Sequence, residues 1–123
     1  MALKPSYNDK LHLPGLSKTE ILILALEASQ KLEWNIEEVT PEGARFEVPF
    51  NMYSHGEEIT FTIDPGNDGE VAVRSQSSSV QFVDYGKNRK NIQKLRETME
   101  EIKTSLTPEE LTQKAKDFEE ECN

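Results

Sequence analysis

The sequence is poor in features that mark secreted, membrane-spanning or disulfide-bonded proteins. It has a single cysteine, Cys122, and no apolar run longer than the six residues 21–26. One cysteine cannot form an internal disulfide, and six apolar residues cannot cross a bilayer. The first residues also lack an apolar signal region. We therefore expect no direct membrane insertion and predict a cytoplasmic location.

Motifs for catalysis and metal binding are missing as well. The two histidines are far apart in the chain, and neither a His-x-x-His nor a Cys-x-x-Cys spacing occurs. No Gly-x-Ser-x-Gly segment and no glycine-rich phosphate loop is found. The sequence consequently assigns no catalytic residue, no metal and no cofactor, and it favours a non-enzymatic protein.

Positive charge is scarce, and the excess of acid is uneven. The net charge is -9, and residues 97–123 alone hold nine acids against three lysines. The preceding part of the chain is therefore nearly balanced. Phosphate backbones repel a chain of this charge, so we do not expect general nucleic-acid binding.

The apolar residues that are present follow regular patterns. A capping box at Ser17 and Glu20 predicts a helix that continues to about Lys31. Strict alternation predicts strands in four later segments: 34–39, 44–50, 58–64 and 70–75. Residues 7–13 alternate more weakly and predict a short edge strand. Such alternation is typical of an antiparallel sheet of four to five strands with one face in water.

A second helix is expected from near Asp84 to about Lys103. Its apolar positions recur at helical spacing and include Leu95 and Met99. Two helices on one face of the sheet make a two-layer α+β sandwich, which we assign to residues 1–104.

Residues 105–123 are expected to form an acidic helical appendage. Thr107 and Glu110 are suitable for a helix start, but the apolar stripe consists only of Leu111, Ala115 and Phe118. So thin a stripe is not stable alone. The helix must dock on the domain, pair with a second copy in a homodimer, or stay disordered, and we favour docking or pairing.

The richest candidate site is the stretch 69–102. Inside this stretch, the ten residues 87–96 contain five bases. Three of these bases fall in the first turns of the second helix, where the helix dipole disfavours positive charge. One interpretation is a structural corner that joins strand to helix through Ser75, Asp84 as N-cap and Gly86. The other is a site for an anion or acidic partner, formed by Arg74, Ser77, Lys87, Asn88 and Arg89. We favour the structural interpretation.

Two resemblances rest on these residues. Three runs, 54–61, 73–77 and 81–92, resemble a small uncharacterised soluble domain of Bacteroidetes proteins, found alone or beside rhomboid-like membrane segments. The Arg-Ser pair at 74–75 and the Asp-x-Gly-x-Asn-basic-basic motif at 84–90 also resemble a broader domain-of-unknown-function family. Both resemblances imply an accessory or regulatory role and a protein partner, with a membrane-associated partner among the options.

Two functional hypotheses follow. The first is a non-enzymatic binding or interaction module. The alternative is a carrier of a small anionic or apolar ligand, or an uncharacterised enzyme, with its site between the sheet and the helices.

Overall fold

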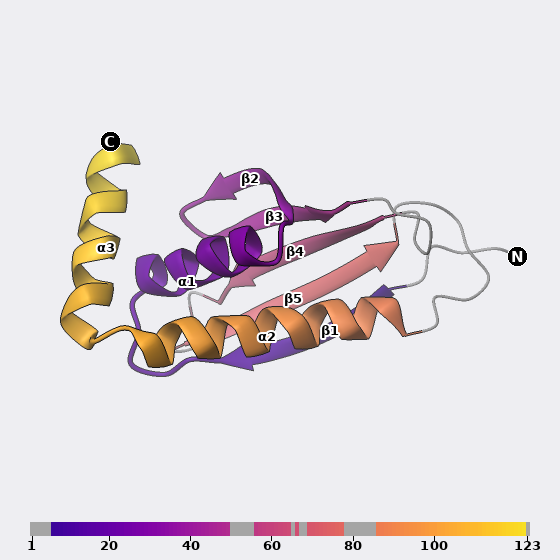
Figure 1. Ribbon diagram of the computed structural model, residues 1–123, viewed down its shortest axis with the longest axis horizontal. Helices are drawn as coiled ribbons and strands as arrows, with labels where there is room; N and C mark the ends of the chain where they lie inside the picture. The colour runs from indigo at the N-terminus through magenta and orange to yellow at the C-terminus, as the bar shows by residue number, and fades with distance from the viewer. Residues whose placement is uncertain (1–5, 50–55, 65, 67–68, 78–85, 123) are drawn as a thin grey trace, which may run out of the picture.

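The structure is a computed structural model that describes residues 6–49, 56–64, 66, 69–77 and 86–122 (Figure 1). Its elements are, in chain order, β1 (Ser6–His12), α1 (Lys18–Lys31), β2 (Asn35–Thr40), β3 (Gly43–Val48), β4 (Glu57–Ile63), β5 (Glu70–Ser77), α2 (Lys87–Ser105) and α3 (Pro108–Cys122). The predicted α+β class is confirmed.

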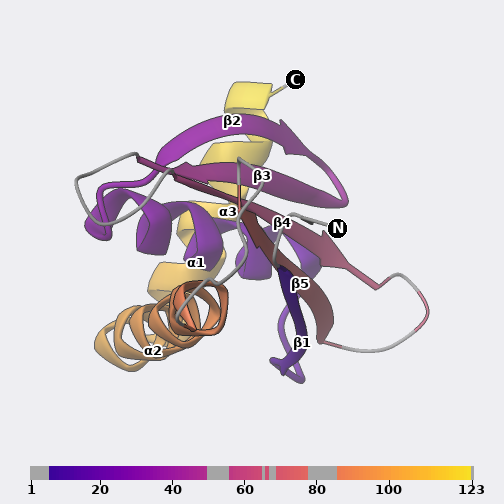
Figure 2. The same cartoon turned by 90° about the vertical axis from the view of Figure 1, so that its right-hand side faces the viewer.

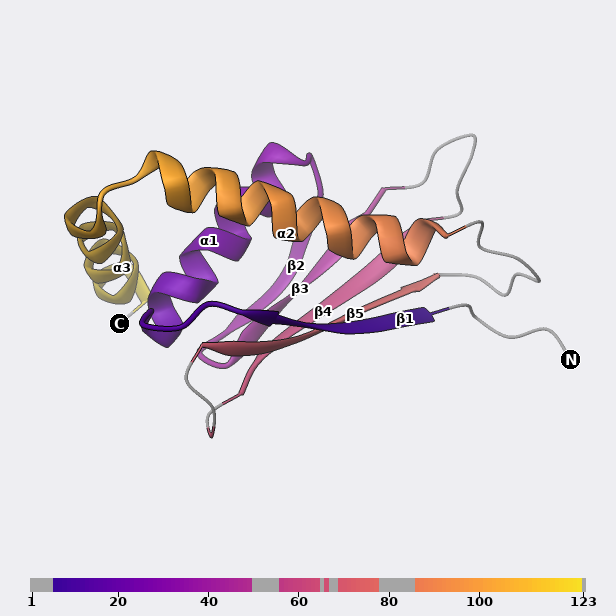
Figure 3. The same ribbon diagram turned by 90° about the horizontal axis from the view of Figure 1, so that it is seen from below.

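The five strands form one antiparallel sheet in the order β1-β5-β4-β3-β2. Strands β2 to β5 make a meander, and β1 joins its far edge beside β5. Both α1 and α2 lie on the same side of this sheet, and the opposite side carries no described helix (Figures 2 and 3). The predicted two-layer arrangement is therefore correct.

Helix α1 has the start that its sequence predicts. The Ser17 hydroxyl accepts from the Glu20 backbone N–H, and the Glu20 carboxylate accepts from the Ser17 N–H. Five consecutive residues, Ile21 to Ala25, are buried, which a helix touching only one surface could not achieve. The helix packs on β2 and β3, on α2 and on α3 together.

Helix α2 begins later than predicted. Its N-cap is Gly86, in the left-handed conformation and without a side-chain cap, and its first turn holds no acid. The helix therefore begins two to three residues after the predicted start near Asp84, and Asp84 itself lies outside the described residues, so its role as a cap stays a prediction. From Lys87 the helix runs over β5 and β1, burying Ile92, Leu95 and Met99.

Helix α3 docks on α1 of the same chain (Figure 1). Leu111 and Ala115 are buried there, and Phe118 is half-buried. Three polar contacts flank them: Thr19 to Glu119, Thr112 to Glu20, and Lys114 to Glu27. Docking, one of the favoured alternatives, is thus what the structure shows. A homodimer through α3, and the division of the chain at residue 104, stay predictions.

The core lies between the sheet and the two helices. Its largest fully buried side chains are Phe46, Phe61, Ile21, Leu24, Ile59, Ile92, Leu95 and Met99. The ring of Trp34 stands 6.4 Å from that of Phe46 and closes one side. Among the described residues, no helix is long and apolar enough to cross a membrane.

An ion pair connects β1 to α2. The Arg96 guanidinium lies 2.7 Å from the Asp9 carboxylate. A hydrogen bond from the Lys10 backbone N–H and a second from Arg96 hold the pKa of Asp9 below its ordinary value, and the charge of Arg89 adds to this. Both side chains of the pair are more than a third exposed, so solvent screens the pair.

Replacing Asp9 with asparagine should therefore lower the free energy of unfolding at pH 7 by only about 0.5 kcal/mol. The pKa of Asp9 is lower in the folded state than in the unfolded state. The carboxylate therefore stabilises the fold fully at pH values above its unfolded-state pKa, and this stabilisation is lost as the pH falls through its folded-state pKa. Urea unfolding at pH 7 and near pH 3 checks this. A difference between wild type and variant that stays constant with pH would contradict the assignment.

Candidate functional site

The start of α2 is joined to the sheet by a buried cluster of polar side chains. The Ser75 hydroxyl donates to Asn88 Oδ1 at 2.8 Å, and Asn88 Nδ2 donates to the Ser77 hydroxyl at 3.2 Å. All three residues are at most 3% exposed. They share a face because alternate residues of β5 point towards α2.

Asn91, one helical turn after Asn88, extends the cluster to β4. Its Nδ2 donates to Glu57 Oε1 at 2.9 Å and to the Ser75 hydroxyl at 3.3 Å. Glu57 is 3% exposed, a rare degree of burial for a carboxylate that is balanced here by hydrogen bonding. We call these five residues, Ser75, Ser77, Asn88, Asn91 and Glu57, the buried polar cluster. It is a structural clamp between helix and sheet.

The structure does not bring the predicted anion-site residues together. Arg74 is exposed on the sheet face opposite α2, while Ser77 and Asn88 bond to each other inside the buried polar cluster. Lys87 and Arg89 lie on the surface of α2, and Arg89 faces the Asp9 side. Of the residues assigned to the structural corner, Ser75 bonds to Asn88 of α2 and Gly86 is the N-cap residue of that helix. Anion binding at the start of α2 stays a prediction.

The role of Glu57 in this cluster could not have been found from sequence. Asn88 and Asn91 carried a signal, because they fall on the same helical stripe as Ile92 and Leu95. Polar residues on a core-facing stripe require buried partners. Nothing in the chain near Glu57 indicates which helix would supply its partner.

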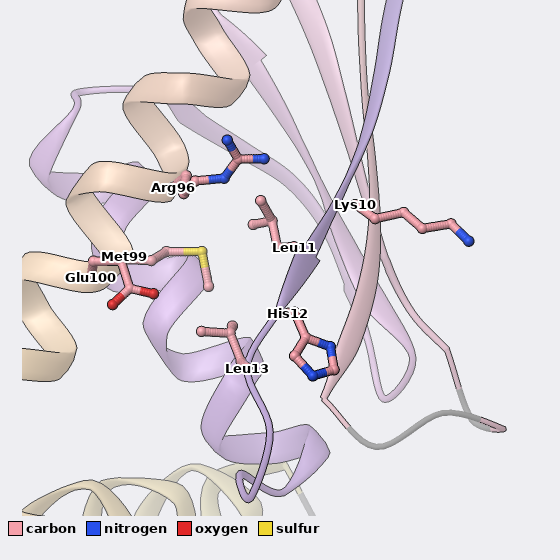
Figure 4. Close-up of a pocket in the computed structure, with 7 residues that line it drawn as sticks. All are labelled: Lys10, Leu11, His12, Leu13, Arg96, Met99 and Glu100. Carbon is pink, nitrogen blue, oxygen red and sulfur yellow. The ribbon is translucent and has the colours of Figure 1, made fainter.

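A small pocket of about 190 Å³ lies between β1 and α2 (Figure 4). Leu11, Leu13 and Met99 converge in it, whereas His12 and Lys10 point to the other side of the strand. The Arg96 guanidinium is paired with Asp9. Since the polar groups of this pocket diverge, it does not form an acid–base pair.

The space between the sheet and the helices is filled by side chains. Phe46, Ile59 and Leu95 are completely buried there, and Val71 and Leu24 pack beside them at the same level of burial. This packing weighs against the carrier hypothesis, which needs a ligand at that interface. The part of the chain that the structure describes also contains no group of three or more potential metal ligands.

A larger apolar depression lies between α1, β2 and α3. Two adjoining hollows of about 450 and 550 Å³ share Val39 and Phe118 in their walls. We call them together the α1–β2–α3 groove. Its apolar side chains are Leu22, Ile23, Leu26, Ile36, Val39, Pro41 and Phe118. Ile36 and Val39, at 39% and 40% exposure, are the exposed large hydrophobic residues of the described chain.

A bulge in β2 aligns these two residues. Ile36 lies opposite Phe46 and Val39 opposite Ala44, while the register shifts between Ile36 and Glu38. Phe46 and Ala44 both face the helices, so Ile36 and Val39 do so too, although they are three residues apart. Simple alternation would have placed them on opposite faces, which is why the sequence did not reveal the groove.

The rim of the groove is predominantly acidic. Four acidic side chains line it, Glu27, Asp117, Glu119 and Glu121, against the two lysines Lys18 and Lys114. Glu27 Oε1 is paired with Lys114 at 3.0 Å. Its second oxygen, Oε2, is buried and has no hydrogen-bond partner among the described residues. An apolar floor with an acidic rim suits a basic amphipathic ligand.

Comparison with protein families assigns the chain to one of them. Residues 6–99 match the sequence profile of a family described as "Protein of unknown function (DUF1499)". The matched region spans β1 to the middle of α2 and leaves α3 outside. No curated protein matches the chain. The predicted resemblance to a broader family of unknown function is thereby confirmed, whereas a Bacteroidetes origin and a rhomboid-like neighbour stay predictions.

Proposed function

The chain belongs to the DUF1499 family of proteins of unknown function, and we propose that it is a non-enzymatic interaction module. In this proposal the module binds a basic amphipathic helix of a partner protein. The observation that carries this proposal is the α1–β2–α3 groove, with its exposed apolar floor and acidic rim. The role is accessory, in that the partner supplies whatever activity follows.

The apolar floor supports a helix as the occupant. Its side chains come from two helices and one strand, a surface into which the apolar face of a third helix fits with contacts at i, i+3, i+4 and i+7. Addition of a strand to the β2 edge is less suitable. That strand is interrupted by the bulge and carries the negative charges of Glu37 and Glu38. Bulges and charged side chains both protect a sheet edge from pairing with another strand.

The rim supports a basic occupant. A lysine or arginine near Glu27 would give the buried Oε2 the partner that it lacks among the described residues. Further bases would face Asp117 and Glu121 on α3. The charge of the ligand would thus set its orientation and its rate of association more than its final affinity. A membrane-associated partner stays a prediction.

The proposal is tested with two synthetic peptides of about 18 residues, long enough for a stable amphipathic helix. One has leucines at helical spacing with lysines elsewhere, and the other has glutamates in place of the lysines. Amide NMR spectra should shift on addition of the lysine peptide at Leu26, Val39 and Phe118. The glutamate peptide should leave these amides unchanged. Shifts spread over all acidic surfaces, without a maximum at the groove, would contradict the proposal.

A further inference from the structure

The sheet face opposite the helices carries a row of polar side chains. Antiparallel register places four of them side by side across four strands: Asn8, Arg74, Thr60 and Arg45. Strands lie about 4.8 Å apart, so the two arginines flank Thr60 at a separation of roughly 10 Å between their backbones. Figure 3 shows α1 and α2 on the other side of the sheet from this face.

The neighbouring row contains the smallest side chains of the sheet. It consists of Lys10, Ala72, Thr62 and Gly43. Gly43 cannot be enlarged, because a Cβ there would lie 2.0 Å from the carbonyl oxygen of Phe61. Gly43 lies outside the hollow of about 560 Å³ that opens over Ala72. That hollow is bordered by the side chains of Lys10, Arg74, Thr60, Thr62 and Asn8, and by β1 and β5 at Asp9 and Val73. We call it the open-face trough.

The polar groups at the open-face trough are hydrogen-bond donors. They comprise one ammonium, one guanidinium, two hydroxyls and one amide. Asp9, the acid beside them, faces away, since it lies opposite buried Val73 and pairs with Arg96 of α2. In a chain with 23 acids and 14 bases, a surface hollow without an inward-facing carboxylate is a clear departure from the average surface.

Both arginines have unused donor capacity. The Arg74 side chain forms no hydrogen bond or ion pair with any residue that the structure describes. Arg45 approaches Glu37 and Glu38 only at 3.8 and 3.5 Å, and its buried Nε has no hydrogen-bond partner in the described chain. Guanidinium groups bind oxyanions with two parallel hydrogen bonds, so a planar or tetrahedral oxyanion in the trough would satisfy Arg74, whereas Arg45 lies outside the trough, beside Glu37 and Glu38.

We propose that the open-face trough binds the phosphate group of a small soluble anion. Arg74 and Lys10 supply the charge, and the hydroxyls of Thr60 and Thr62 supply further donors to the oxygens. The small side chain of Ala72 leaves the space that the ligand occupies. Lys10 must partly exchange its contact with Glu70, at 3.2 Å, for the ligand. This site is independent of the α1–β2–α3 groove and lies on the other face of the sheet.

Inorganic phosphate, titrated at fixed ionic strength against chloride, tests the proposal. Amide signals of Lys10, Thr60, Thr62 and Arg74 should shift and saturate together. The variant Arg74→Gln should weaken binding at least about tenfold. Ala72→Leu should abolish it by filling the trough without changing the charge.

The matched control is Lys94→Gln, which removes an exposed cation from α2, outside every candidate site, and should leave phosphate binding unchanged. An equal loss in this control would mean that phosphate responds only to net charge, and would overturn the site. Shifts confined to residues 86–89 would place the anion at the start of α2 instead. Binding only to vesicles that contain phosphatidic acid, with no response to soluble phosphate, would overturn the assignment to a soluble ligand.

Discussion

Replacing Asn88 with leucine should lower the free energy of unfolding by about 3 kcal/mol. Leucine has a similar volume, but it removes the acceptor of the Ser75 hydroxyl and the donor to the Ser77 hydroxyl. Both serines are buried, so water cannot replace the lost bonds. Urea unfolding with an unchanged m-value measures the effect.

A second variant separates the hydrogen bonds from the packing. If Ser75 and Ser77 are changed to alanine together with Asn88→Leu, no hydroxyl is left unsatisfied, and part of the stability should return. Gln76→Ala is the matched control, because Gln76 lies between the two serines but on the other face of β5. A loss from Asn88→Leu no larger than from Gln76→Ala would show that the buried polar cluster does not hold α2.

Replacing Gly69 with alanine should cost at least about 2 kcal/mol of stability. Gly69 has φ +71°, which disfavours any side chain, and a Cβ there would lie 2.3 Å from the carbonyl oxygen of Leu13. That carbonyl belongs to the connection after β1, and the Leu13 N–H donates to the Gly69 carbonyl at 2.7 Å. The close approach therefore joins the β4–β5 turn to the chain that leads into α1.

Gly66→Ala is the control for this variant. Gly66 lies in the same turn, its φ is outside the left-handed region, and among the described residues a Cβ there would meet the Asp64 side chain at 3.4 Å, an ordinary van der Waals distance. Its replacement should change the stability by no more than about 0.5 kcal/mol. Thermal unfolding of the two variants compares them directly. Equal losses would mean that neither the backbone angle nor the approach to Leu13 matters.

Local patterns predicted most of the fold. The capping boxes at Ser17 and Thr107 both form, and the alternating segments form the expected antiparallel sheet. The start of α2 was predicted too early because aspartate ranks above glycine as an N-cap residue, which favoured position 84 over position 86. Sequence alone did not indicate that Gly86 would turn the chain in the left-handed conformation.

The candidate site was less predictable because it depends on which face each element covers. Alternation already placed Arg74 and Ser75 on opposite faces of β5, but the prediction joined both to the start of α2. Only the position of α2 on the Ser75 side separates them. The α1–β2–α3 groove similarly combines the consecutive elements α1 and β2 with the distant helix α3 and depends on a bulge, and no local sequence pattern indicates such a combination.

The central claim is that the α1–β2–α3 groove holds a basic helix. Val39→Lys tests it, because Val39 is exposed enough for lysine to be accommodated and its charge would repel a basic ligand from the apolar floor. Gln93→Lys adds the same charge at an exposed position of α2, outside the groove, and serves as the matched control.

Fluorescence anisotropy with the labelled lysine-leucine peptide measures both affinities at one ionic strength. We predict that Val39→Lys weakens binding at least about tenfold, or 1.4 kcal/mol, whereas Gln93→Lys weakens it less than about twofold. Equal weakening by the two variants would show that the peptide responds to net charge alone, and would contradict the groove as a binding site.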